Sequence, residues 1–98
     1  MYALCLLRYR TGLEEVLKHV DAHRAYLAQW REKGVLLVSG PFEPRFGGAL
    51  LVRVPEDQEG RRTLEALRDN DPFVVEGVAQ YEILPWKPTN GLDKLDSF

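Results

Sequence analysis

The sequence predicts an α+β domain in which four strands form one antiparallel sheet and two helices lie on one of its faces. Four short segments rich in leucine and β-branched residues are separated by turn residues, and two longer segments have the spacing of amphipathic helices. Their order is β-α-β-β-α-β, which is the split βαβ, or ferredoxin-like, plan. With 98 residues, 45% of them hydrophobic, the chain suffices for one small domain.

The composition excludes several classes of partner. The 13 basic and 15 acidic residues leave a formal charge of −2, which gives no electrostatic reason to bind nucleic acid or an anionic membrane. No apolar run reaches membrane-spanning length, and the N-terminus lacks the basic region of a signal peptide. The single cysteine, Cys5, cannot form an intrachain disulfide. We therefore expect a cytoplasmic protein that binds neither nucleic acid nor membrane.

The first half of the chain is expected to begin with a strand and the longer helix. Residues 2–9 are almost wholly apolar and end at a Thr11-Gly12 turn, as a buried strand does. Between residues 13 and 33 apolar side chains recur every three or four positions, which predicts one continuous helix. Gly34 is suited to cap its C-terminus.

The rest of the domain is expected to hold a hairpin, a weaker helix and the last strand. Residues 35–39 and 49–54 are the strands of the hairpin, 56–70 have a weak helical pattern, and 78–84 form the last strand. Each of these three strands is expected to stop where a proline follows within two residues.

The chain is expected to pair with a second copy of itself. The predicted strands are apolar at successive positions, as at 4–7 and 50–52, so neither face of the sheet suits water. A chain this short also buries only about two-thirds of its unfolded surface. We therefore expect a homodimer of a domain formed by residues 1–86. Residues 87–98 have no clear period and are expected to be a tail, either disordered or an arm laid across the partner.

One histidine lies within the apolar stripe of the longer helix. At the helical rotation of about 100° per residue, His23 falls on the side of the helix that faces the core. A buried ring without a hydrogen-bond partner would lower the stability of the fold by roughly 1–3 kcal/mol. Asp71 follows the second helix four residues after its anchor Leu67, so its carboxylate can point inward. A carboxylate on one ring nitrogen fixes the tautomer and stabilises the imidazolium, which suits general acid–base catalysis. The same pair also fits a histidine held for stability alone.

A metal site near this histidine is the weaker alternative. His19 precedes His23 by four residues and Glu15 lies one turn earlier, a spacing that could hold zinc. His19 falls at the edge of the stripe, however, and the second helix offers no compelling ligand. We therefore expect neither a metal nor another cofactor.

Three further residues are candidates for binding a substrate. Tyr26 continues the side of the helix that His23 begins and could line a planar pocket, although such rings more often pack in a core or an interface. The hydroxyl of Ser39, at the end of a strand, could reach a ligand. Arg45, in the loop that joins the two hairpin strands, could pair with a ligand carboxylate, although a solvated arginine is commoner.

Several short motifs along residues 2–86 carry a resemblance to a known family. They are His23, Tyr26 and Leu27; Ser39-Gly40-Pro41; Gly47-Gly48; Asp71-Pro72-Phe73; Gly77; and Ile83-Leu84-Pro85-Trp86. Together they resemble the YCII-related family of ferredoxin-like proteins, whose members pair into dimeric α+β barrels. The resemblance implies that fold and a catalytic role for His23 and Asp71.

The function expected from the His23–Asp71 pair is metal-free general acid–base chemistry, and the resemblance implies a small aromatic or lactone-like substrate. The resemblance implies a lyase, isomerase or dehydrochlorinase-type step in a cleft of the homodimer. A non-catalytic module that binds a small ligand in the same pocket, or that serves for interaction alone, is the alternative. A purely structural His23–Asp71 pair would leave no pocket at the histidine.

Overall fold

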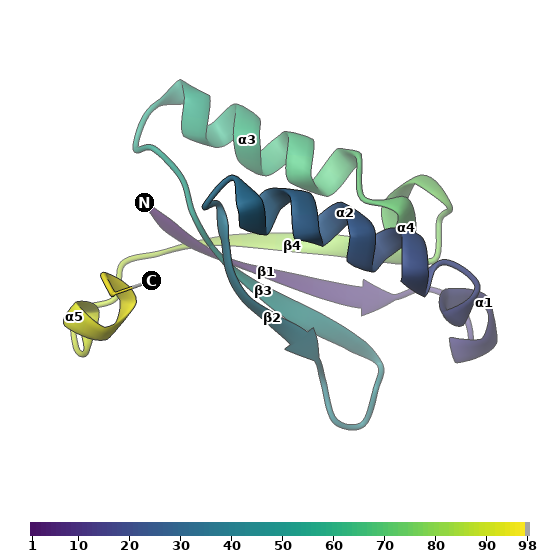
Figure 1. The fold of residues 1–98 in the computed structure, drawn as a ribbon. Helices are drawn as coiled ribbons and strands as arrows, with labels where there is room; N and C mark the ends of the chain where they lie inside the picture. The colour runs from purple at the N-terminus through teal and green to yellow at the C-terminus, as the bar shows by residue number, and fades with distance from the viewer. Residues whose placement is uncertain (98) are drawn as a thin grey trace.

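In the computed structural model, which describes residues 1–97, four strands form one antiparallel sheet in the order β2-β3-β1-β4. The two long helices, α2 and α3, lie side by side on one face of the sheet (Figure 1). The predicted ferredoxin-like α+β plan is confirmed. The strands are β1 (Tyr2–Tyr9), β2 (Leu36–Pro41), β3 (Gly47–Arg53) and β4 (Ala79–Trp86), and the helices are α1 (Leu13–Leu17), α2 (Val20–Glu32), α3 (Gln58–Asp69), α4 (Pro72–Val75) and α5 (Leu92–Leu95).

The prediction of one continuous helix over residues 13–33 is wrong. A turn at Lys18 and His19 separates α1 from α2, and the His19 N–H bonds to the Val16 carbonyl three residues back, at 3.0 Å. Such a tightened bond ends a helix. Periodicity did not reveal the break because Val16 and Val20, on either side of it, are both buried. Gly34 ends α2 with φ +77°, the left-handed conformation that favours glycine.

Two strands include the prolines that were expected to stop them. β2 continues to Pro41, which lies opposite Gly48, and β4 continues past Pro85, which lies opposite Ala3. Both strands are at the edges of the sheet. Proline lacks the backbone N–H. In an edge strand alternate N–H groups point away from the sheet, so a proline at such a position removes no hydrogen bond between strands and the strand can include it.

A glycine that weakens the helical pattern of α3 is required by packing. A side chain at Gly60 would place its Cβ only 1.8 Å from the backbone oxygen of Pro55. The Gly60 N–H also donates a hydrogen bond to the side chain of Asp57, the N-cap residue, at 3.2 Å. The chain therefore gives up helix propensity here to bring α3 close to the end of the preceding strand.

The short helix α4 was not predicted. Proline is favourable at the first position of a helix, and the Asp71 carboxylate accepts the Phe73 N–H at 2.9 Å as the N-cap. The break at Pro72 is therefore also the start of one helical turn. This turn holds Asp71 in a fixed place between α2 and β4.

The core lies between the helices and the sheet. Alternate residues of the strands face the helices, and they pack with one side of α2 and α3 in a single cluster. The main members of the cluster are Ala3, Cys5, Leu7, Val16, Val20, Leu27, Leu50, Val52, Leu64, Leu67, Phe73 and Ala79.

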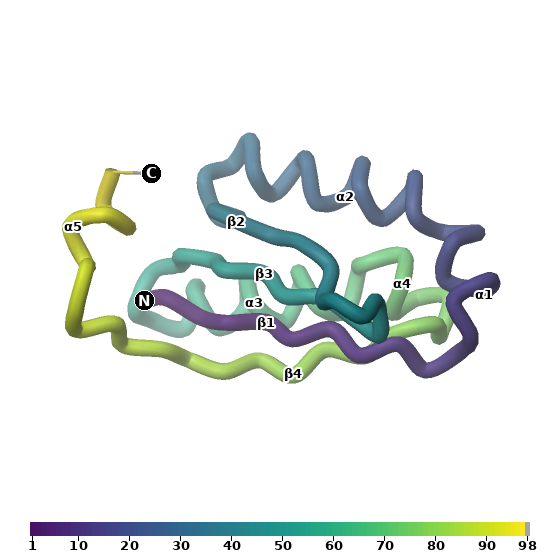
Figure 2. The backbone as a smooth tube through the Cα atoms, turned by 90° about the horizontal axis from the view of Figure 1, so that it is seen from below, coloured from purple at the N-terminus to yellow at the C-terminus, as the bar shows by residue number. Residues whose placement is uncertain are grey.

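The opposite face of the sheet carries an apolar row. Val38 pairs with Leu51, Leu51 with Leu4, and Leu4 with Leu84, so the row crosses all four strands. Val38 is 49% exposed and Leu84 is 38% exposed. We call these four residues the open-face row; Figure 2 is the view from this side.

The described part of the tail, residues 87–97, turns back toward the start of the chain. It carries α5, which lies near the end of the sheet where the N-terminus is found (Figures 1 and 2). The Tyr2 hydroxyl donates a hydrogen bond to Asp96 at 3.0 Å. The rest of the predicted tail, residue 98, is outside the described residues. None of the helices described in residues 1–97 is long and apolar enough to cross a membrane.

Candidate active site

The side chains of His23 and Asp71 meet. His23 lies one turn into α2, and its Nδ1 is 2.8 Å from Oδ1 of Asp71 at the start of α4. Asp71 is fully buried, at 0% exposure, whereas the His23 side chain is 13% exposed. The contact expected from the sequence is therefore present, between a sealed carboxyl group and a ring that reaches the surface.

Three donors converge on the Asp71 carboxyl group. Nδ1 of His23 and the N–H of Phe73 contact Oδ1, and the Tyr81 hydroxyl donates a short hydrogen bond to Oδ2. A carboxylate accepts on both oxygens, so it satisfies this arrangement. A buried acceptor with this many partners is held rigidly in one orientation.

Tyr81 is a site residue that the sequence analysis missed. It lies on β4 and faces the helices, and burial, followed by the neighbouring Asp71 carboxylate, raises the pKa of its hydroxyl far above the ordinary value. Tyr81 therefore stays a neutral donor. A tyrosine on the inward side of β4, between the apolar Ala79 and Ile83, needs an acceptor, but the strand pattern does not say which residue supplies it.

The contact with Asp71 assigns the donor role to Nδ1 of the His23 ring. A carboxylate can only accept, so the hydrogen of the neutral ring lies on Nδ1 and Nε2 is left with a lone pair. The ring stacks on Phe73, with centroids 3.9 Å apart and planes at 5°. Nε2 has no hydrogen-bond partner among residues 1–97. The arrangement can therefore accept a proton at Nε2.

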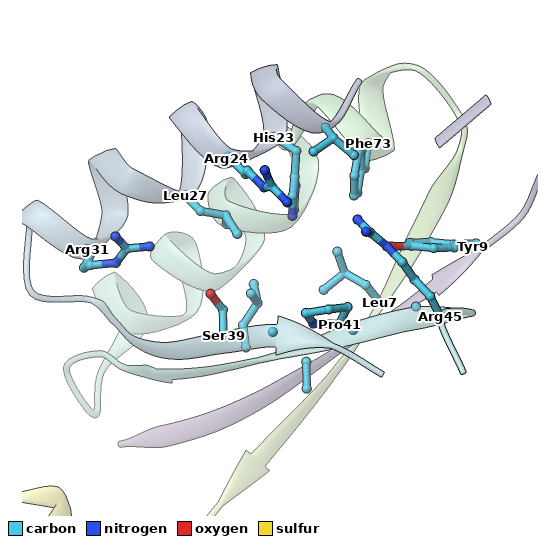
Figure 3. A pocket seen from close by; sticks show the side chains of 16 residues that line it. Leu7, Tyr9, His23, Arg24, Leu27, Arg31, Ser39, Pro41, Arg45 and Phe73 are labelled. Atoms are coloured by element: carbon cyan, nitrogen blue, oxygen red, sulfur yellow. The ribbon is translucent and has the colours of Figure 1, made fainter. Parts of the chain in front are cut away.

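His23 lies at the wall of a cavity of about 430 Å³. The cavity opens between α2, the paired ends of β2 and β3, and Phe73 of α4, and the His23 ring points into it (Figure 3). This volume is within the range of small-molecule sites.

The predicted substrate-binding residues divide into two groups. Ser39 and Arg45 line the cavity. Tyr26 does not line it, because its hydroxyl donates to the backbone carbonyls of Ala66 at 3.1 Å and Leu67 at 2.9 Å on α3. Tyr26 instead ties α2 to α3.

Two arginines that line the cavity were not singled out from the sequence. Arg24 and Arg31 project from the same side of α2 as His23 and Leu27. Residues 24, 27 and 31 are spaced by three and four positions, so one face of the helix carries them all. The spacing was visible in the sequence, but exposed arginines on a helix are commonly only solvated.

The two other residues of the alternative metal site differ in their surroundings. Glu15 accepts a hydrogen bond from Lys18 at 2.8 Å, and this contact lowers the pKa of the Glu15 carboxyl group. His19 is the N-cap residue of α2, and its side chain makes no capping hydrogen bond. Over residues 1–97 no three side chains of the histidine, cysteine, aspartate and glutamate types are grouped so as to hold a metal ion.

Comparison with known proteins gives a family and similar solved structures. The model of the YCII-related domain matches residues 1–87. The 5-chloro-2-hydroxyhydroquinone dehydrochlorinase of Burkholderia phenoliruptrix AC1100, solved in complex with 2,5-dihydroxybenzoquinone, has a similar fold, with a TM-score of 0.74 and 24% identity. The alignment covers 91% of this chain and 96% of that chain. No curated protein sequence matches significantly.

Proposed function

Because the chain belongs to the YCII-related domain family, we propose that it is a small-molecule enzyme that uses His23 and Asp71 for metal-free general acid–base catalysis. The observation that carries the proposal is the 2.8 Å contact between Nδ1 of His23 and Asp71, which leaves Nε2 free beside a cavity. The reaction class is a lyase, isomerase or dehydrochlorinase-type step.

In this proposal Nε2 of His23 takes a proton from the substrate. Asp71 holds the ring through Nδ1 and stabilises the imidazolium that forms. In an isomerisation the proton returns to another atom of the substrate. In a dehydrochlorination the electron pair of the broken bond to hydrogen forms a new double bond, chloride leaves with its own pair, and the imidazolium releases the proton to solvent.

Tyr81 and Phe73 are positioning residues in this scheme. The Tyr81 hydroxyl and the Phe73 N–H hold the carboxyl group of Asp71, and the Phe73 ring holds the plane of the imidazole. Support of this kind keeps a catalytic group in its productive geometry. The dehydrochlorinase with a similar fold binds 2,5-dihydroxybenzoquinone, and a planar aromatic substrate is the corresponding proposal for this chain.

The proposal includes a homodimer formed through the open-face row. Val38, Leu4, Leu51 and Leu84 form a continuous apolar strip across the sheet. Exposed leucine and valine in one strip are costly to hydrate, and a second copy presents the same strip in return. The cavity lies on the helix-covered side, so dimerisation leaves it accessible.

The proposed function is tested by the dependence of rate on pH for halogenated phenols and lactones. We expect one of these substrates to turn over, with a limb of the pH–rate profile that disappears in His23→Gln. Binding of these compounds without turnover in the wild-type protein would support the non-catalytic module instead.

A further inference from the structure

Three arginines surround the cavity that holds His23. Arg24 and Arg31 lie on α2, and Arg45 lies in the loop between β2 and β3. Figure 3 shows Arg31 and Arg45 reaching toward the cavity from opposite ends, with Arg24 beside His23. Of the described residues that line the cavity, none is an aspartate or a glutamate.

These arginines form no ion pair with the residues that the structure describes. Arg45 donates from Nε to the hydroxyl of Tyr9 at 3.2 Å, and the side chains of the other two have no hydrogen-bond or ion-pair partner in residues 1–97. Several cations elsewhere are paired: Arg8 with Glu82, Lys18 with Glu15, and Arg68 with Asp69. The cavity thus carries positive charge that the chain itself does not neutralise, and it will attract an anion.

The surface between the arginines is apolar. It is formed by Leu7, Val20, Leu27, Leu50 and the ring of Phe73. An inorganic anion would gain nothing from such a surface, whereas an organic ligand would bury its carbon skeleton there. Guanidinium groups also match the planar fork of a carboxylate, which they bind with two parallel hydrogen bonds.

We propose that this cavity binds a small, planar organic dianion with carboxylate-type groups at its two ends. One group pairs with Arg31 and the hydroxyl of Ser39, and the other pairs with Arg45. The skeleton between them packs on the apolar surface, which places it beside His23 and Arg24. This inference rests on the proposed function, because it assigns the substrate class of the same site.

The test uses the full chain and three ligands of one shape. Terephthalate has two carboxylates, 4-carbamoylbenzoate has one, and terephthalamide has none. Isothermal titration calorimetry should show a fall in affinity of about tenfold for each carboxylate replaced, since each loses a charge-assisted hydrogen bond. Terephthalate binding should weaken with added salt, and inorganic phosphate should bind more weakly than terephthalate.

Arginine variants locate the binding. Arg31→Gln and Arg45→Gln should each weaken terephthalate binding about tenfold and have less effect on 4-carbamoylbenzoate. Arg61→Gln is the matched control, because Arg61 is an exposed arginine of α3 that lies outside the cavity. Equal affinity for terephthalate and terephthalamide, phosphate binding as tight as that of terephthalate, no terephthalate binding at millimolar concentration, or unchanged affinity in both cavity variants would each overturn the proposal.

Failure of this inference can be told apart from failure of the proposed function. If the dianion binds in an arginine-dependent way and no compound is turned over, the anion site is supported and the proposed catalytic function is contradicted. Turnover of a neutral substrate that needs His23 but neither Arg31 nor Arg45 would support the enzyme and contradict the anion site.

Discussion

The two faces of the sheet depart from the usual distribution of side chains in opposite ways. The helix-covered face buries a carboxyl group, Asp71, at 0% exposure, and joins it to a histidine and a tyrosine. The open face has instead a row of leucine and valine, with Val38 49% exposed. A small domain that followed only the needs of folding would bury the apolar row and expose the carboxyl group.

The difference indicates that each face serves something other than the stability of a single chain. A buried carboxyl group whose oxygens all accept hydrogen bonds destabilises the fold only slightly. It still contributes less net stability than apolar side chains packed in the same place would. Places where a sequence departs from its local rules are where function is expected. Chemistry is the proposed reason on one face, and association with a second copy is the proposed reason on the other.

The largest expected effect is on catalysis at the helix-covered face. His23→Gln should lower turnover by about 100-fold or more, the scale for loss of a general acid–base group. The variant should remain folded, with a melting temperature within a few degrees of the parent, because Asp71 keeps the Phe73 and Tyr81 donors. Steady-state rates and thermal melts measured together check this.

His19→Gln is the control for that variant, because His19 lies one turn away and has no contact with Asp71. It should leave both rate and melting temperature unchanged. If His23→Gln unfolds the protein, the His23–Asp71 pair serves the stability of the core, and the helix-covered face has no proposed catalytic role.

On the open face the expected effect is on association. Leu51→Lys places a charge in the middle of the open-face row, next to Leu4 and Val38. Each dimer loses two buried leucines, so the dissociation constant should rise by about 100-fold or more. Sedimentation should show the mass falling from twice 11.2 kDa toward 11.2 kDa. A parent chain that is already a stable monomer at micromolar concentration would contradict the proposal.

Val75→Lys is the matched control for Leu51→Lys. Val75 is 66% exposed but lies on α4, on the other side of the sheet. The same change there should leave the dimer intact. Dissociation of both variants would mean that added charge, rather than the open-face row, is responsible.

A smaller effect is expected from removing the third donor to Asp71. Tyr81→Phe leaves Oδ2 of the buried carboxyl group without its hydrogen bond, which costs about 1–3 kcal/mol and lowers the melting temperature by several degrees. Turnover should fall about tenfold, since the carboxyl group can then shift against His23. Tyr26→Phe also loses a hydroxyl, one bonded to α3, and it should lower stability with little change in turnover. Equal effects of the two changes on turnover would remove the positioning role of Tyr81.

The order of the elements and the His23–Asp71 contact could be predicted because both follow from local patterns. Periodicity showed which side of each helix is buried, and a histidine on that side needed a partner. The position of Asp71, four residues after Leu67, and the family resemblance both selected it as that partner. The helix break at His19 could not be seen in the sequence because buried residues continue across it, and the extension of β2 to Pro41 depends on its being an edge strand.

The rest of the site could not be predicted because it depends on tertiary neighbours. Tyr81 becomes a partner of Asp71 only once β4 lies beneath α4. The cavity needs α2, the β2–β3 hairpin and Phe73 together, so Arg24 and Arg31 had no visible role in the sequence, and only Arg45 was a candidate. Tyr26 was assigned to the pocket by helix side alone, while α3 in fact takes up its hydroxyl.

The effect expected to be smallest near neutral pH is that of the buried Cys5 thiol on the helix-covered face, which acts only in alkaline solution. Cys5 lies at the centre of the sheet with 0% exposure, and burial raises the pKa of its thiol from 9.0 to about 11. The folded chain therefore keeps this proton between pH 9 and 11, while the unfolded chain loses it. The contribution of this thiol to the free energy of unfolding is fully present below about pH 9. It is lost as the pH rises toward 11, and the loss is roughly 2 kcal/mol. Urea denaturation at several pH values measures the fall.

Cys5→Ala separates this contribution from that of Tyr81, whose raised pKa acts in the same direction at higher pH. The variant should be less stable at pH 7, because alanine leaves a small cavity, but its stability should fall less steeply between pH 9 and 11. A thiol reagent at pH 8 should also fail to modify Cys5 until the chain unfolds. Rapid modification of the folded protein would mean that the helix-covered face opens readily. Such opening would also expose Asp71 to water, and the contrast between a sealed polar face and an open apolar one would then be lost.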